Sequence, residues 1–148
     1  MTPFKLKIVT PSGVFFGKKE DKHYYTGRDV VNVIVRTTVG DKGILAKHEP
    51  YIAALPIGIV RIMVEDNKYR NAAISTGTIQ VTEGGDTTIL VQSCEWCDEI
   101  DVARAEAAKK RAEEDMARAE ETDENVKYKV AEFKLKRALN RLDNAEIP

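Results

Sequence analysis

The sequence is short of three features that would each assign it to a broad class of protein. It holds two cysteines, Cys94 and Cys97, too few for the disulfide framework of a small secreted domain. Its formal net charge is −1 although 32% of its residues are charged, which argues against a dedicated nucleic-acid-binding protein. Its longest apolar run, residues 51–60, is interrupted by Pro56 and Gly58 and falls short of the roughly 20 apolar residues of a membrane helix. Residues 1–10 also lack the apolar segment of a signal peptide. We therefore expect a soluble protein of a reducing compartment, with no direct membrane insertion.

Recognisable catalytic and metal-binding motifs are missing as well. Cys94 and Cys97 have CxxC spacing, but zinc needs two more ligands, and the two histidines, His23 and His48, stand far back in the chain. A thioredoxin-type redox motif would begin a helix in a βαβ unit, and no such context is present. No nucleophile or acidic partner accompanies His48 in a known arrangement. We predict no catalytic residue and no metal or redox cofactor, and a cysteine-based metal or redox module remains an alternative.

The first part of the chain, residues 1–95, alternates apolar and polar side chains with the period of a β-strand. In residues 4–10, Phe4, Leu6 and Ile8 alternate with lysines. Residues 30–39 are rich in β-branched side chains, residues 58–66 alternate again, and residues 78–92 form a hairpin candidate around Gly84 and Gly85. The polar segment 18–29 is expected to be a surface loop or an extended hairpin tip. Short strands at this spacing predict an antiparallel sandwich or barrel.

The second part, residues 96–148, changes to a helical pattern. Residues 98–121 contain neither Gly nor Pro and are dense in strong helix formers, with Asp98 as the expected N-cap. The polar break at residues 121–125 predicts a second helix capped by Thr122 or Asp123. Two helices joined by a short break predict an antiparallel two-helix hairpin. Because its first helix is rich in alanine and buries little area, we expect this hairpin to be marginally stable alone.

Folding these helices together about residue 122 brings arginines from both toward the open end of the hairpin. Arg104 stands 18 positions before that point and Arg141 stands 19 after it. Arg137 precedes Arg141 by one turn, and Arg111 follows Arg104 by two turns. Gathered like charges cost free energy unless they splay into solvent or hold an anion, and guanidinium groups suit phosphate. The arginines are either a phosphate site or the solvated faces of a charged hairpin.

Three segments in order carry a resemblance to a known family. Residues 9–16 match an opening strand and turn, and residues 136–142 match the end of a second helix. Residues 40–55 match a Gly-Ile-Leu run followed by Pro-Gly-His, although Ala46 and Lys47 stand here in place of Pro-Gly. Over nearly its whole length the chain resembles the epsilon subunits of bacterial F-type ATP synthases. The resemblance implies an α+β fold, with an N-terminal antiparallel β-sandwich in residues 1–95 and an antiparallel two-helix hairpin in residues 96–148.

The resemblance also implies a ligand for the arginines. Some bacterial members of the family bind ATP on the hairpin through an Ile/Leu-Asp-x-x-Arg-Ala motif, and residues 100–105 have this pattern. Matching positions elsewhere imply that the arginines bind phosphate while two carboxylates help to place the base or ribose. The implied ATP-binding residues are Glu95, Ile100, Asp101, Arg104, Ala105, Arg111, Arg137 and Arg141.

Implied partners follow from the same resemblance. The chain would be a non-catalytic rotor subunit that contacts the gamma subunit, the membrane rotor ring and the alpha/beta catalytic head of a proton- or sodium-translocating synthase. Asp41 and His48 would lie at subunit interfaces, and the protein would be peripheral on the cytoplasmic face of the bacterial plasma membrane. ATP would be a regulatory ligand, and the hairpin would inhibit ATP hydrolysis. The alternatives are the same subunit without a functional ATP site, or a free-standing nucleotide sensor.

Overall fold

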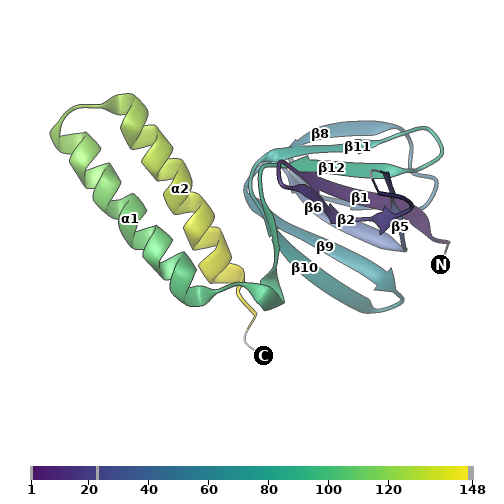
Figure 1. Cartoon of the computed structure of the whole chain (residues 1–148). Coiled ribbons are helices and arrows are strands. Elements are labelled where there is room, and N and C mark those ends of the chain that lie inside the picture. Colours follow the sequence, from purple (N-terminus) through teal and green to yellow (C-terminus); the bar gives the residue numbers. More distant parts are fainter. Residues whose placement is uncertain (1, 23, 147–148) are drawn as a thin grey trace. The chain divides into compact units, whose positions relative to one another are not determined.

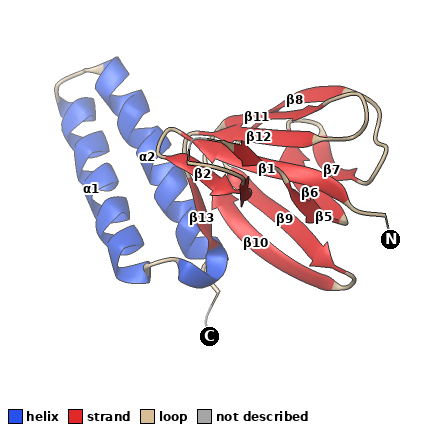
Figure 2. Cartoon of the chain, turned by 45° about the vertical axis from the view of Figure 1, so that its right-hand side comes forward, coloured by secondary structure: helices blue, strands red, loops and turns tan. Residues whose placement is uncertain are grey.

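The computed structural model describes residues 2–22 and 24–146, which leaves out His23, and the chain divides into two compact units. Met1–Trp96 contains all the strands, and Cys97–Pro148 contains the helices. Figure 1 shows the two units, and Figure 2 shows that strand and helix are segregated between them. The predicted fold class, a β-sandwich followed by two helices, is confirmed.

The first unit is built from two sheets and a small separate ribbon. One sheet has the order β2-β1-β12-β11-β8 with β5 also pairing with β1, the other has the order β13-β10-β9-β6-β7, and β3 pairs with β4. Every pair is antiparallel except β1 with β12, which is parallel and departs from the all-antiparallel expectation. The strands are β1 (Phe4–Thr10), β2 (Gly13–Phe16), β3 (Lys18–Lys19), β4 (Tyr25–Thr26), β5 (Arg28–Val30), β6 (Asn32–Thr37), β7 (Gly40–Ile44), β8 (Tyr51–Leu55), β9 (Gly58–Glu65), β10 (Lys68–Ile74), β11 (Gly77–Val81), β12 (Thr87–Val91) and β13 (Cys94–Trp96).

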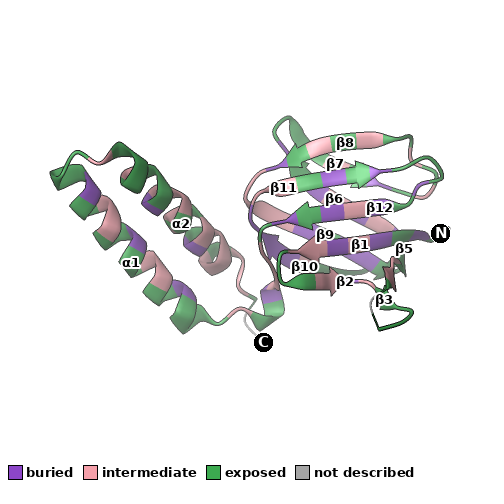
Figure 3. Ribbon diagram, turned by 45° about the horizontal axis from the view of Figure 1, so that its top comes forward, coloured by how far each residue is buried: buried purple, intermediate pink, exposed green. Residues whose placement is uncertain are grey.

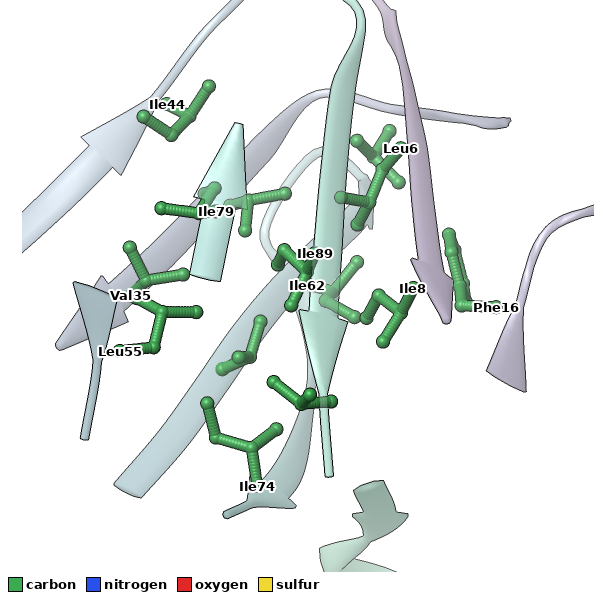
Figure 4. Packing of buried hydrophobic residues seen from close by; sticks show 14 of the residues in the cluster. Leu6, Ile8, Phe16, Val35, Ile44, Leu55, Ile62, Ile74, Ile79 and Ile89 are labelled. Atoms are coloured by element: carbon green, nitrogen blue, oxygen red, sulfur yellow. The ribbon is translucent and has the colours of Figure 1, made fainter. Parts of the chain in front are cut away.

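The core lies between these two sheets and follows the period-two pattern of the sequence. Leu6 and Ile8 of β1 are fully buried, whereas Lys5 and Lys7, which alternate with them, point to the other face of the sheet. Ile89 comes from the same sheet as β1 and Ile62 from the opposite sheet, and both side chains are fully buried. Figure 4 shows these aliphatic side chains directed toward one another. The alternation predicted for the first strand is therefore confirmed.

Turns between the strands also follow the sequence. β11 and β12 form the predicted hairpin, and both glycines in its turn have a positive φ, 97° at Gly84 and 94° at Gly85. The polar segment 18–29 forms the short β3–β4 ribbon and then β5, so its expectation as an extended hairpin is confirmed. Lys47 adopts a φ of 61°, the left-handed conformation that glycine tolerates best.

The second unit is an antiparallel pair of helices, but its caps differ from the sequence-based expectation. A 3-10 turn, Cys97–Glu99, precedes α1 (Val102–Glu121), and α2 runs over Asn125–Asn144. The N-cap of α1 is Asp101 and not Asp98, because Asp98 lies in the 3-10 turn. The expectation that Thr122 or Asp123 caps α2 is also wrong. Thr122 ends α1, where its backbone N–H donates to the carbonyl of Arg118, and the N-cap position of α2 is Glu124.

Small side chains occupy the buried positions of the two helices. Figure 3 shows buried positions that recur along the helices of this pair. Along α1 and α2 every fully described buried residue is an alanine, and each follows the previous one on its helix by seven residues. A repeat of seven keeps these side chains on one side of the helix. The buried set is Ala105, Ala112, Ala119, Ala131 and Ala138.

Candidate functional site

Cations accompany the alanine interface along one side of the hairpin. On each helix they repeat every seven residues, so that each set stays on one side of its helix. Paired across the antiparallel hairpin, they stand equally far from the turn at three levels, separated by about 10.5 Å along the helix axis. The tip pair is Arg118 with Lys127, the middle pair is Arg111 with Lys134, and the base pair is Arg104 with Arg141.

A groove between the helices places Arg118 of α1 and Lys127 and Lys134 of α2 on the same side of the hairpin. The groove has a volume of about 350 Å³ and is lined from α1 by Asp115 and Arg118, and from α2 by Lys127 and Lys134. Arg111 precedes Asp115 by one helical turn and therefore lies on the same side of α1. We call this side of the hairpin the cationic face, and we define it by the three cation pairs together with Arg137.

Carboxylates neutralise the tip pair. Arg118 donates to Asp115 over 3.0 Å, and the Nζ of Lys127 lies 2.7 Å from a carboxylate oxygen of Glu124. Lys134, by contrast, makes no ion pair with any residue of the described ranges 2–22 and 24–146. Because exposed ion pairs contribute little to stability, their main effect here is on the local potential. The positive potential of the cationic face is consequently less compensated at the middle of the hairpin than at its tip.

The base of the hairpin is organised by the Ile-Asp-x-x-Arg-Ala segment. The carboxylate of Asp101 accepts a hydrogen bond of 3.1 Å from the backbone N–H of Arg104, and its carbonyl accepts one of 3.0 Å from Ala105. Ala105 is buried, Ile100 is half-buried, and the Arg104 side chain is exposed. Asp101 therefore starts the helix, while the arginine projects from its first turn.

Arg137 lies between the middle and base pairs and has an unusual environment. Its guanidinium carbon lies 5.5 Å from the centre of the Phe133 ring. Its Nε is buried and finds no acceptor among the described residues of the chain. A buried donor without an acceptor costs free energy, so this nitrogen is a place where a ligand acceptor would be stabilising.

The remaining implied site residues belong to the first unit. Glu95 is a half-buried residue of β13. Asp41 of β7 stands opposite Arg36 of β6 and forms an ion pair with it, which raises the pKa of the Arg36 guanidinium through a hydrogen bond and direct charge attraction. The Nδ1 of His48 lies 2.7 Å from the carbonyl oxygen of Glu49. Neither contact tests the interface roles of Asp41 and His48, which stay predictions.

Trp96 and the cysteines take no part in a recognisable site. The Trp96 ring packs against Phe15 and Phe16 at centroid distances of 4.9 and 6.1 Å, and the guanidinium of Arg70 lies 4.0 Å above it. Cys94 is half-buried and Cys97 is buried, and both are reduced. Within residues 2–22 and 24–146 there is no group of three or more His, Cys, Asp or Glu side chains that could hold a metal ion. Neither α1 nor α2 has the length and apolar character needed to cross a membrane.

Two family profiles together match almost the whole chain. Residues 3–97 match the domain described as "ATP synthase, Delta/Epsilon chain, beta-sandwich domain", and residues 98–146 match "ATP synthase, Delta/Epsilon chain, long alpha-helix domain". The chain belongs to the delta/epsilon-chain family of ATP synthases.

Individual members of this family align with almost the whole length of the chain. The ATP synthase epsilon chain of Ruminococcus albus is 40% identical over 145 residues, which are 98% of this chain and 98% of that protein. The epsilon chain of Caldicellulosiruptor bescii is 40% identical over 147 residues, 99% of this chain and 96% of that protein. A solved structure of the Euglena gracilis mitochondrial ATP synthase (OSCP/F1/c-ring) contains a chain with the same fold, at a TM-score of 0.72 and 21% identity over 95% of this chain and 79% of that one.

Reasoning from the sequence missed part of the cationic face. It identified the arginines of the base pair together with Arg111 and Arg137, and it did not group the lysines of the second helix with them. The signal that identifies Lys127 and Lys134 is their spacing of seven residues from each other and from Arg141, which matches the arginine spacing on α1.

Proposed function

We propose that this chain is a non-catalytic subunit of the central stalk of an F-type ATP synthase. The proposal is supported by epsilon-chain relatives that match over the whole length. It is also supported by the Euglena gracilis mitochondrial structure described above, whose OSCP/F1/c-ring assembly contains a chain of the same fold. In this role the protein binds to the rotor and performs no chemistry itself, and it is peripheral on the cytoplasmic face of the bacterial plasma membrane.

The β-sandwich is the part we assign to attachment. It would bind the gamma subunit and the membrane rotor ring, and thus couple the ring to the alpha/beta head during transport of protons or sodium ions. Asp41 and His48 lie in β7 and in the loop after it, and we assign both to this contact. Attachment of this kind needs a rigid body, and the continuous aliphatic core between the two sheets supplies one.

The hairpin is the part we assign to regulation by ATP. The observation that carries this assignment is the cationic face, on which Arg104, Arg111, Arg137 and Arg141 come from two helices whose fully described buried residues are all alanine. A triphosphate would neutralise these guanidinium groups and accept from the buried Nε of Arg137. Ile100, Asp101 and Ala105 complete the proposed site on the hairpin, with the carboxylate of Asp101 placing the base or ribose.

Binding of ATP to the closed hairpin alone would stabilise that form. At a ligand concentration of 100 times Kd the stabilisation is about 2.7 kcal/mol. When ATP is scarce, the hairpin would extend into the alpha/beta head and block hydrolysis of ATP. The second candidate function is the same stalk subunit with a purely structural or inhibitory hairpin, in which case the arginines are solvated surface charges.

A thermal melt distinguishes these two functions. We expect millimolar ATP to raise the melting temperature of the hairpin in the wild-type protein, and Arg104→Ala to reduce that increase. Arg118→Ala is the matched control, because Arg118 is on the same face of α1 but is already paired with Asp115. If wild-type protein melts at the same temperature with and without ATP, the hairpin is not an ATP site and the second function holds.

The stalk assignment has its own test. The protein should co-purify with gamma, alpha and beta chains when it is expressed with them, and added to an assembly of those chains it should lower the rate of ATP hydrolysis. A chain that stays free of all three would instead be the free-standing nucleotide sensor.

A further inference from the structure

Lys134 belongs to the middle pair of the cationic face, and the ATP site proposed above does not include it. It stands at the same level as Arg111 on the facing helix, and its side chain lines the groove of about 350 Å³ between the helices. It also borders a second, shallower hollow on α2 that Phe133 and Arg137 line. Lys134 thus connects the groove with the environment of Arg137.

Neighbouring charges set the direction in which a nucleotide could lie on this face. At the base, the carboxylate of Asp101 would repel phosphate and is suited to accept from an amino or hydroxyl group. At the tip, Asp115 and Glu124 already neutralise Arg118 and Lys127. Among the described residues neither Arg111 nor Lys134 forms an ion pair, so the phosphate chain of a nucleotide anchored beside Asp101 should end between them.

Separation between the two levels agrees with this orientation. The base and middle pairs lie about 10.5 Å apart along the axis, and the long side chains of lysine and arginine can close much of that interval by tilting toward each other. A nucleoside triphosphate extends one phosphate farther than a diphosphate from the same anchored base. The middle pair is then within reach of the last phosphate of a triphosphate, and less so of a diphosphate.

We propose that Lys134 is a further binding residue of this site, and that with Arg111 it contacts the terminal phosphate of a nucleoside triphosphate. This inference rests on the proposed ATP-binding function of the hairpin and adds to it the basis for preferring triphosphate over diphosphate. The lysine ammonium contributes a compact charge and three donors, which suits a terminal phosphate that carries the most negative charge of the chain.

Calorimetric titration of the full-length protein with ATP and with ADP tests the assignment. In Lys134→Gln we expect the Kd for ATP to rise about tenfold, as for the loss of one hydrogen bond to a charged group. The Kd for ADP should change by less than about twofold, because its last phosphate stops short of the middle pair. Lys134→Arg, which keeps the charge, should retain most of the affinity for ATP. Lys127→Gln is the matched control and should leave both constants unchanged, since Glu124 already pairs with Lys127.

Each other outcome overturns a defined part of the reasoning. If wild type binds ATP and Lys134→Gln binds it equally well, Lys134 is not a ligand-binding residue and the ATP site itself stands. Equal losses for ATP and ADP would refute the terminal-phosphate contact. If wild type binds no ATP, the proposed function and this inference both fail. A circular dichroism melt of each variant verifies that the hairpin is folded.

Discussion

Enlarging one alanine at the helix contact should open the hairpin without touching a charged residue. Ala112 is 2% exposed and lies at the middle of the alanine repeat on α1. Ala112→Leu would add three carbon atoms to a side chain that is almost completely buried. Overpacking of this kind typically costs about 1–3 kcal/mol, because backbones and side chains must shift to make room.

That cost is large relative to what the buried alanines contribute to the helix contact. The five buried alanines each bury roughly one methyl group, and at ~0.8 kcal/mol for each group they contribute about 4 kcal/mol in total. An unfavourable term of about 1–3 kcal/mol therefore removes between a quarter and three quarters of this contribution. We expect the hairpin of Ala112→Leu to melt well before the β-sandwich, at a temperature at which wild-type hairpin is still folded.

Far-ultraviolet circular dichroism followed during heating measures the effect, since the helical signal comes from the second unit alone. Ala107→Leu is the matched control, because Ala107 is an exposed residue of the same helix and the substitution changes composition equally. We expect the control to melt like wild type, and ATP to recover part of the loss in Ala112→Leu if it binds the closed hairpin. A variant at Ala112 that is as stable as its control would refute the claim that close alanine packing holds the helices.

Two further predictions concern the β-sandwich. Lys47→Gly should raise the melting temperature of this unit by about 2–5 °C, because the relief of a left-handed conformation (about 1–2 kcal/mol) exceeds the entropic cost of glycine (about 0.5–1 kcal/mol). Asn67→Gly is the control and should gain less, because asparagine tolerates its φ of 61°. A lower melting temperature for Lys47→Gly would contradict this reasoning. The pKa of Glu20 lies below its ordinary value of 4.5 because the Thr26 hydroxyl donates to it and Lys18 lies nearby. Its contribution to the stability of the β3–β4 ribbon is therefore present above pH 4.5 and is lost as the pH falls through the lowered pKa. In an NMR titration Thr26→Val should raise this pKa toward 4.5, and an unchanged pKa would show that the hydroxyl has no such role.

The β-sandwich could be predicted from sequence because one face of each strand is buried. One face of β1 is buried and the other is exposed to solvent. The alternation of Leu6 and Ile8 with lysines is therefore sufficient to identify β1 as a strand. The parallel pairing of β1 with β12 could not be predicted in the same way. Strand direction depends on which segments meet after more than seventy intervening residues, and the local pattern of either strand is the same for both directions.

The predicted caps of the two helices were wrong for a different reason. Asp98, Asp101, Thr122 and Asp123 are all residue types that cap helices, and within one turn several of them satisfy the same rule. Asp98 is part of the 3-10 turn Cys97–Glu99, so α1 begins only after this turn and Asp101 is its N-cap. At the other end of α1, Asp123 has a left-handed conformation with a φ of 56°, which ends the helix. The second helix, α2, therefore begins after Asp123.

Sequence spacing and structure together explain why a ligand could decide the state of this hairpin. Repeats of alanine and of cations share the period of seven residues, so every level that brings two helices close also brings two positive charges together. The alanines supply about 4 kcal/mol, and a ligand at 100 times its Kd supplies about 2.7 kcal/mol, which are energies of similar size. A leucine-rich contact would make the closed state independent of ligand, whereas an alanine contact leaves its population sensitive to the anion on the cationic face. It follows that substitutions which strengthen the contact should weaken any dependence of the closed form on ATP, even when every phosphate-binding residue is intact.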